Sequence, residues 1–523
     1  MPEGNLCLVL HAHLPFVRHP EHPQFLEEDW LFEAITETYV PILAIAERLR
    51  HDRVAFQFAM TLSPTLCEML DDKLLQERYA RHLAGRLELI ERERHRGRNP
   101  AAVEMYRRLF SQAQDIVERR NGRRLLGAFK ALQDSGHLEI LTCGATHGFL
   151  PNMARPEAAN AQIAVAVANY RKHFGRAPRG IWLPECGYAP GVDATLKRHG
   201  IEWFIVDSHG VLNGSRVPKR GVFAPVRTPA GVAVFARDRE SSKQVWSAKE
   251  GYPGDGVYRE FYRDLGYDAD LDYIKPYLHP DGVRRNVGLK YHRITGDVAL
   301  HAKEPYDPAA AAAKADEHAG NFVFNRRQQA RYLKAKQGAV PTIVSPYDAE
   351  LFGHWWFEGP RFLESVARRM AEPGSEVALI SPSDVLKIET RLQVLEPSMS
   401  TWGDKGYAEV WLNPVNDWMI RHQHRAEDRM VGLARRDNPS GLERRALNQA
   451  ARELLLAQSS DWAFLITVGT ASPYGHRRFR DHVARFTRLA DGIEREKVDE
   501  RHLQESEERD TLFPELDYRV YAG

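Results

Sequence analysis

The chain has 523 residues, more than one hydrophobic core usually organises, so a catalytic domain with appended parts is expected. Its 72 basic and 71 acidic residues leave a formal net charge of +1, which excludes a strong long-range attraction to nucleic acid or anionic lipid. The four cysteines form no CxxC pair, and no run reaches the roughly 20 apolar residues of a membrane span. We therefore expect a cytoplasmic protein with neither a nucleic-acid nor a membrane partner.

Short apolar strands alternate with amphipathic helical segments along most of the chain. Strands are predicted within residues 5–16, 53–64, 138–151, 180–190, 201–211, 339–353 and 376–384. Alternation of strands with helices indicates a parallel sheet and an α/β fold. Because polar residues end nearly every strand, the count of about seven favours an incomplete seven-stranded (β/α) barrel over an open sheet.

Two long insertions interrupt this alternation. Residues from about 73 to 134 are highly charged and helical in pattern, which predicts a helical excursion beside the barrel. Residues from about 212 to 308 are rich in Gly, Pro and Tyr and predict large loops over the barrel mouth. After a returning helix the pattern becomes helical, so we expect a catalytic barrel over 1–394 and a C-terminal all-helical domain over 395–523.

Ionisable side chains recur where the predicted strands end. These are His11, His13, His147, Glu185, Asp207, His209, Asp348 and Glu350. In barrels of this type the carboxyl ends of the strands meet at one mouth, where active sites are built. The pattern therefore predicts a catalytic site at that mouth.

Two kinds of chemistry fit these residues. His11 and His13 share one face of a strand and could bind a divalent metal, as in metal-dependent sugar deacetylases. Alternatively, Glu185 and Asp348 are the nucleophile and the acid/base of a retaining glycosidase, whose carboxyl groups lie about 5–5.5 Å apart. Tryptophans near these motifs favour the glycosidase, because an indole ring can stack on the apolar face of a sugar. They are Trp182, Trp355, Trp356, Trp402 and Trp411.

Five motifs, in chain order, resemble the signature regions of glycoside hydrolase family 57. They are HAHLPF (11–16), GATHGFLP (144–151), GIWLPECGY (180–188), YDAELFGHWWFEGP (347–360) and AEVWLNPVNDW (408–418). SKQVWSAKEGYPGD and YREFYRDLGYD resemble the 1,4-alpha-glucan branching enzymes of that family. The resemblance spans nearly the whole chain and implies an incomplete seven-stranded barrel, a helical C-terminal domain, an α-glucan substrate such as amylose, amylopectin or glycogen, and no required metal or cofactor.

The resemblance also implies residue roles. Glu185 matches the family's nucleophile and Asp348 its acid/base. Arg259 or Arg263 matches a binding arginine, and Trp402 and Asp461 match positions from which the helical domain reaches the sugar. The full set of expected substrate-binding residues is His11, His13, His147, Trp182, Arg259, Arg263, Trp355, Trp356, Trp402, Trp411 and Asp461.

A mobile lid is predicted over residues 235–254, which are polar and end in glycines. It includes Phe235, Lys243 and Trp246. Branching members often place a tyrosine at the tip of this loop, but residues 235–245 contain none. The expected activity is 1,4-alpha-glucan branching, with α-amylase or 4-alpha-glucanotransferase as the alternative and a metal-dependent sugar deacetylase as a distant one.

Overall fold

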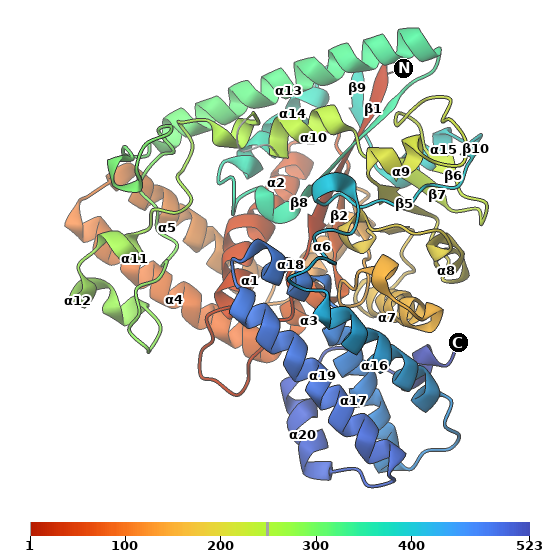
Figure 1. The fold of residues 1–523 in the computed structure, drawn as a ribbon. Coiled ribbons are helices and arrows are strands. Elements are labelled where there is room, and N and C mark those ends of the chain that lie inside the picture. Colours follow the sequence, from red (N-terminus) through yellow and green to blue (C-terminus); the bar gives the residue numbers. More distant parts are fainter. Residues whose placement is uncertain (1, 247–249) are drawn as a thin grey trace.

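The computed structural model describes residues 2–246 and 250–523 and has a central group of strands surrounded by helices (Figure 1). One sheet has the parallel order β3-β2-β1-β8, and β9 pairs with the first residues of β1. Its strands are β1 (Gly4–Ala12), β2 (Phe58–Leu62), β3 (Leu138–Leu141), β8 (Thr342–Asp348) and β9 (Val377–Leu379). The register places His11 opposite Asp348, so two strand-end residues predicted to share a site lie side by side.

A second sheet has the order β10-β6-β7-β5-β4. Its strands are β4 (Gly180–Ile181), β5 (Trp203–Val206), β6 (Val226–Arg227), β7 (Ala233–Ala236) and β10 (Gln393–Val394). The two sheets are joined by backbone hydrogen bonds. Trp182 donates to the carbonyl of Thr142 at 2.9 Å, and Asp238 donates to the carbonyl of Val344 at 2.8 Å. The strands therefore form one connected group.

Alternate residues of the strands fill a shared interior. This core cluster includes Cys7 and Val9 of β1, Ile205 of β5, and Phe235 of β7. Such alternation follows from the two-residue period of a strand, which places every second side chain on the same face. The prediction that Phe235 belongs to a lid loop is therefore wrong, because its side chain is buried inside the strand group. The apolar residues of β7 were hidden in a segment rich in Gly and Pro.

The segment 212–308 is more structured than its composition suggests, since its described residues form two strands and several short helices. Helix α9 (Ser208–Leu212) ends where this segment begins. The α-helices inside it are α10 (Arg239–Trp246), α11 (Leu265–Asp268) and α12 (Leu271–Ile274). Lys243 and Trp246 of the predicted lid lie on α10, and residues 247–249 of that lid fall outside the described residues.

Helices pack around the strands. They are α1 (Glu28–Ala34), α2 (Val40–His51), α3 (Pro64–Asp71), α6 (Leu125–Asp134), α7 (Pro156–Phe174), α8 (Val192–Arg198), α13 (Pro308–Gln337), α14 (Gly359–Met370) and α15 (Pro382–Ile388). The long helix α13 begins at Asp307, whose carboxylate accepts from the amides of Ala309 and Ala310, and ends at Gly338 in the left-handed conformation. Among the described residues, none of the helices combines the length and hydropathy that crossing a membrane requires.

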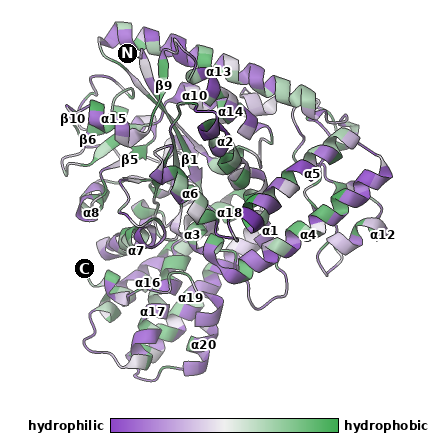
Figure 2. Ribbon diagram, turned by 180° about the vertical axis from the view of Figure 1, so that it is seen from behind, coloured by the Kyte–Doolittle hydropathy of each residue, from purple (hydrophilic) through white to green (hydrophobic). Residues whose placement is uncertain are grey.

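The charged segment after α3 forms the helices α4 (Lys73–Arg96) and α5 (Pro100–Gln114), which extend away from the strands (Figure 1). Hydrophilic and hydrophobic residues alternate along both helices (Figure 2). This pattern is expected of helices with one buried and one solvent-exposed face.

The C-terminal region is helical. It contains α16 (Trp418–Ala434), α17 (Gly441–Ala457), α18 (Ser460–Val468), α19 (Ser472–Glu494) and α20 (Glu500–Arg509). Four of these helices form a bundle below the strands, and the short α18 lies between the bundle and the strand group (Figure 1).

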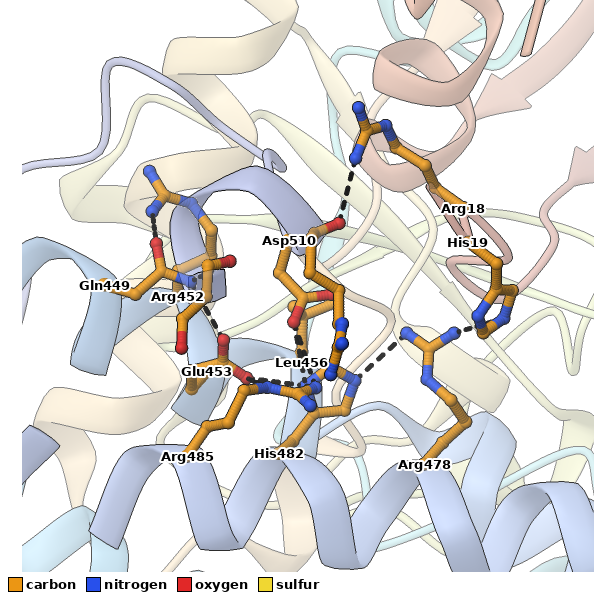
Figure 3. A network of polar contacts seen from close by, with 12 residues as sticks. Arg18, His19, Gln449, Arg452, Glu453, Leu456, Arg478, His482, Arg485 and Asp510 are labelled. Carbon is orange, nitrogen blue, oxygen red and sulfur yellow. Dashed lines mark hydrogen bonds and ion pairs between the residues drawn. The ribbon is translucent and has the colours of Figure 1, made fainter. Parts of the chain in front are cut away.

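A buried polar network, which we call the clasp, lies within this bundle (Figure 3). Arg485 of α19 pairs with Glu453 of α17 at 3.1 Å and with Asp510 at 3.0 Å. His482 donates from Nδ1 to Glu453 at 2.8 Å and accepts from Arg478 at Nε2. This neutral form agrees with the pKa of His482, which burial and the neighbouring arginines hold well below its ordinary value.

The clasp also reaches the segment that follows β1. Arg478 donates to Nε2 of His19 at 3.1 Å, and Arg18 donates to the backbone carbonyl of Arg509 at 3.0 Å. Because Glu453 lies on the helix directly before α18, these contacts fix where α18 meets the strands.

The first prediction tests the clasp with Arg485→Met. Loss of the guanidinium leaves Glu453 and Asp510 buried without their cation, so the free energy of unfolding should fall by about 3–5 kcal/mol. Chemical denaturation at pH 7.5 measures this value. In Arg501→Met, which removes an exposed pair with Glu505, the change should stay below about 1 kcal/mol. Equal changes in both variants would contradict a structural role of the clasp.

Candidate active site

Glu185 lies just after β4, in a 3₁₀ turn over Pro184–Cys186. Its backbone has φ of 63°, in the left-handed region that costs a non-glycine residue about 1–3 kcal/mol. Cys186 and His147 also have positive φ, at 49° and 58°. Strained residues of this kind persist where the surrounding structure holds them, and they concentrate at functional sites.

The carboxyl group of Glu185 accepts hydrogen bonds from the C-terminal part of the chain. Ser460 of α18 donates to Oε1 at 3.0 Å, and the indole nitrogen of Trp402 donates to Oε2 at 3.0 Å. Burial raises the pKa of Glu185 to about 7, the charge of Asp461 adds to this rise, and the bond from Trp402 opposes it. Glu185 therefore ionises near neutral pH.

Asp348 ends β8, and a second carboxyl group, Glu350, follows two residues later. Burial and the charges of Glu350 and Glu185 raise the pKa of Asp348 well above its ordinary value, while Arg237 lowers it. Glu350 accepts from the hydroxyl of Tyr39 at 2.5 Å, and burial raises its pKa to about 7. Both Asp348 and Glu185 are therefore harder to ionise than free carboxyl groups.

Three histidines stack beside these carboxyl groups. The rings of His13 and His147 lie 3.9 Å apart, and those of His11 and His147 lie 5.1 Å apart. Burial, together with neighbouring histidine charge, holds the pKa values of His11 and His147 well below the ordinary range. These two imidazoles are neutral at physiological pH.

Asp461, next to Ser460 on α18, accepts from Nε2 of His13 at 3.1 Å. Burial raises the pKa of Asp461, but the contact with His13 outweighs this effect and leaves the pKa below its ordinary value. Asp461, which was predicted to extend from the helical domain into the site, therefore does reach the strand-end histidines.

Two groups here contain metal-ligand residue types within 4.8 Å of one another: His13, His147 and Asp461, and His11, Cys143 and His147. Each nitrogen of His147 is already hydrogen-bonded, to His11 at 2.9 Å and to Ser460 at 2.8 Å. A metal would have to displace one of these bonds. The geometry therefore fits hydrogen-bonded imidazoles better than the ligands of a deacetylase metal.

The predicted tryptophans fall into two classes. Trp182, Trp356 and Trp411 are buried, and the prediction that they bind sugar is corrected because none offers an exposed ring face. Trp182 stacks on His11 at 4.6 Å, and Trp411 stacks on Phe149 at 4.7 Å.

The other two predicted tryptophans are accessible. Trp402 is partly buried against Glu185, with Trp246 of α10 at 6.3 Å from its ring. Trp355 is 54% exposed and stacks on Phe261 at 4.5 Å, so its outer face is open to a ligand.

Neither predicted arginine reaches these carboxyl groups. Arg259 is buried, pairs with Glu37 at 3.0 Å and lies over the ring of Phe357. Arg263 pairs with Asp268 and donates to backbone carbonyls of residues 300–303. Both predictions are corrected, because each guanidinium is taken up by protein partners.

Sequence reasoning did not assign roles to Ser460, Tyr39 or Arg237. Ser460 directly precedes Asp461, which was predicted to reach the sugar, so this neighbour could have been found. Arg237 pairs with Asp207 at 3.3 Å and lies over the ring of Trp402 at 5.8 Å. No sequence signal distinguishes it from a surface arginine.

Comparisons with known proteins agree with this arrangement. Residues 7–323 match the model of glycosyl hydrolase family 57, and residues 422–521 match the model described as 1,4-alpha-glucan branching enzyme, C-terminal. The chain is 37% identical to a 1,4-alpha-glucan branching enzyme of Thermococcus kodakarensis, over 98% of this chain and 77% of that protein.

Two solved structures are similar throughout. A novel alpha-amylase from Thermotoga maritima superposes with a TM-score of 0.94 at 44% identity, covering 100% of this chain and 99% of the other. A branching enzyme from Pyrococcus horikoshii superposes with a TM-score of 0.89 at 35% identity, covering 100% and 97%. With a family match over more than half of its residues and relatives similar along its whole length, this chain belongs to glycosyl hydrolase family 57.

Proposed function

We propose that this protein is a 1,4-alpha-glucan branching enzyme that cleaves an α-1,4 linkage and transfers the enzyme-bound part of the donor chain to a glucan 6-hydroxyl. The proposal is carried by the two carboxyl groups at the ends of β4 and β8 in a chain that is 37% identical to a branching enzyme over 98% of its length, and their pKa values support it. Glu185 has a pKa of about 7, and the pKa of Asp348 is well above its ordinary value. An anionic carboxylate beside a protonated carboxylic acid is what a retaining mechanism requires.

In the first step Glu185 attacks the anomeric carbon of the donor while Asp348 protonates the glycosidic oxygen that leaves. The C–O bond to the leaving chain breaks, a bond to the Glu185 carboxylate forms, and Asp348 becomes anionic. The α-linked donor is thereby converted to a β-linked glucosyl-enzyme.

In the second step Asp348 accepts the proton of a glucan 6-hydroxyl, and the oxygen of that hydroxyl displaces Glu185. This second inversion yields an α-1,6 branch. Water in place of the glucan would give hydrolysis, so transfer needs an acceptor that is held in position and a site that excludes water. We assign acceptor or donor contacts to the accessible Trp355 and Trp402.

A second candidate function is α-amylase activity. It is favoured by the 44% identity to the Thermotoga maritima alpha-amylase and by the absence of a tyrosine from residues 235–245. In that case water is the acceptor in the second step, and the rest of the chemistry is unchanged.

Incubation of the enzyme with amylose separates these functions. New reducing ends and α-1,6 linkages are measured in parallel, the latter by proton NMR and by debranching. Branches with few new reducing ends support the proposal, and reducing ends without branches indicate the amylase. Redistributed chain lengths without either signal would indicate 4-alpha-glucanotransfer.

We also infer that the two sheets together form an incomplete seven-stranded barrel in the order β8-β1-β2-β3-β4-β5-β7. The hydrogen bonds between Trp182 and Thr142 and between Asp238 and Val344 support this inference. In this inferred order β7 is the seventh strand, in place of the strand expected within residues 376–384. We retain 1–394 as the catalytic part and 395–523 as the helical part, and the four unpaired cysteines support a cytoplasmic location.

The second prediction concerns pH. The free enzyme needs ionised Glu185, whose pKa is about 7, so kcat/KM should fall about tenfold for each pH unit below that value. The alkaline limb should lie higher, since it reports loss of the Asp348 proton, and both limbs belong to the coupled pair. Initial rates on amylose give the profile, with circular dichroism to verify folding. An acid limb near pH 4.5 would contradict the assignment.

The third prediction separates the roles of the two carboxyl groups. Glu185→Gln removes the attacking charge, so transfer and hydrolysis should fall together. Asp348→Gly should lose activity on amylose yet still react with an α-maltosyl fluoride, whose leaving group needs little protonation.

Added azide can then enter on the side that Asp348 vacated and should give the α-azide after a second inversion. NMR of the product defines its anomeric configuration. A β-azide from Asp348→Gly, or full activity of Glu185→Gln, would mean that the two roles are reversed.

The fourth prediction contrasts neighbouring tryptophans. Trp356→Ala empties a buried site and should lower the free energy of unfolding by about 3–5 kcal/mol. Trp355→Ala should change stability by less than about 1 kcal/mol but raise KM for amylose severalfold. Tyr332→Ala, an exposed aromatic on α13, is the control and should change neither quantity. An unchanged KM in Trp355→Ala would remove Trp355 from the binding surface.

A further inference from the structure

A chain of three hydrogen bonds connects the carboxyl group of Glu185 with the buried ring of His11. Ser460 Oγ lies 3.0 Å from Glu185 Oε1, and His147 Nδ1 lies 2.8 Å from Ser460 Oγ. The Nε2 atoms of His147 and His11 lie 2.9 Å apart. His11, His147 and Ser460 are each about 3% exposed, so water does not compete for these bonds.

The direction of every bond follows once Glu185 is ionised. A carboxylate only accepts hydrogen bonds, so the single hydroxyl proton of Ser460 must be donated to Oε1 of Glu185. Ser460 therefore accepts from His147, which fixes the proton of that neutral ring on Nδ1. The bare Nε2 of His147 then accepts from His11, which must carry its proton on Nε2.

These assignments leave Nδ1 of His11 as a bare acceptor. In agreement with them, Nδ1 is the nitrogen of His11 that has no hydrogen-bond partner among the described residues. The chain therefore starts at a buried nitrogen and ends at the nucleophile, with each donor pointing toward Glu185.

We propose that Ser460, His147 and His11 form a hydrogen-bond relay that positions the ionised carboxylate of Glu185. In this relay every donor points toward Glu185 while the carboxylate is ionised, and every donor points the opposite way when the carboxyl group is protonated. The inference rests on the proposed function in one respect, namely that Glu185 is the nucleophile. The three residues are positioning residues, since they act through Glu185. Because both nitrogens of His147 serve the relay, this histidine has no nitrogen left for a sugar hydroxyl.

Reversal follows from the second contact of the carboxyl group. The indole of Trp402 can only donate, which keeps Oε2 as the acceptor and places an added acid proton on Oε1, facing Ser460. In the reversed relay Ser460 accepts from Glu185 and donates to Nδ1 of His147. His147 carries its proton on Nε2 and donates to His11, which then carries its proton on Nδ1.

The proton count of this change balances. The protonated form holds one proton more than the active form, and the two histidine protons then lie on Nδ1 of His11 and on Nε2 of His147. Ser460 holds one hydroxyl proton in both forms, and Oε1 of Glu185 holds a proton only in the protonated form. Four groups thus hold three relay protons in the active form and four in the protonated form.

Neutron diffraction of deuterium-exchanged crystals tests the relay without any glucan. At pD above 8 we expect deuterium on Nδ1 of His147 and on Nε2 of His11. At pD below 6 we expect it on Nε2 of His147, on Nδ1 of His11 and on Oε1 of Glu185. The opposite tautomer at high pD, or a doubly deuterated His147, would overturn the relay.

A variant pair tests its effect on catalysis. Ser460→Ala removes a hydrogen bond to a charged group, so kcat should fall about tenfold to hundredfold with KM nearly constant. The acid limb of kcat/KM should also move up by about one pH unit, because the anion loses a donor. Ser460→Thr keeps the hydroxyl and should restore both values.

Ser398→Ala is the matched control. The Ser398 hydroxyl donates to the backbone carbonyls of His209 and Gly210, so its loss should leave the acid limb in place. A loss of activity in Ser460→Ala without movement of the acid limb would reduce Ser460 to a packing role and refute the relay. Expected tautomers in an enzyme that forms no α-1,6 linkages would instead refute branching and leave the relay standing.

Discussion

The interaction on which the site depends is the pair of hydrogen bonds that the carboxyl group of Glu185 accepts from Trp402 and Ser460. These donors lie 217 and 275 residues further along the chain, so the segment that carries Glu185 does not complete the site by itself. The site is complete only when the C-terminal part of the chain is in place. The clasp around His482 and Arg485 therefore has a functional consequence, because it holds the bundle from which α18 projects.

Burial organises the electrostatics of the site. It is the largest cause of the raised pKa values of Glu185 and Asp348 and of the lowered values of His11 and His147. Every one of these shifts favours the neutral form, as expected where water is scarce. The same exclusion of water strengthens electrostatic interactions with a developing charge and disfavours hydrolysis relative to transfer. The electrostatics and the proposed acceptor choice thus have one physical origin.

Strand-end residues could be predicted from the sequence because a parallel arrangement collects them at one edge, and the register of His11 with Asp348 bears this out. Partners of buried groups could not. Arg259 resembled a binding residue, yet its carboxylate partner Glu37 lies 222 residues away. Aromatic composition likewise identified Trp355 and Trp356 together, although one is half exposed and the other is buried, since a core indole and a sugar platform look identical in sequence.

The segment beside Glu185 is rigid, which bears on the proposed activity. The segment that carries Trp402 is held at three points to the residues that follow β4 and β5. The amide of Trp402 donates to the carbonyl of Glu185 at 3.0 Å, Tyr188 donates to the carbonyl of Ser400 at 2.9 Å, and His209 contacts the carbonyl of Gly406 at 2.7 Å. We infer that an acceptor binding against Trp402 contacts a surface that is already ordered in the free protein. Less conformational entropy of the protein is then lost on binding, which favours attack by a glucan hydroxyl over attack by water.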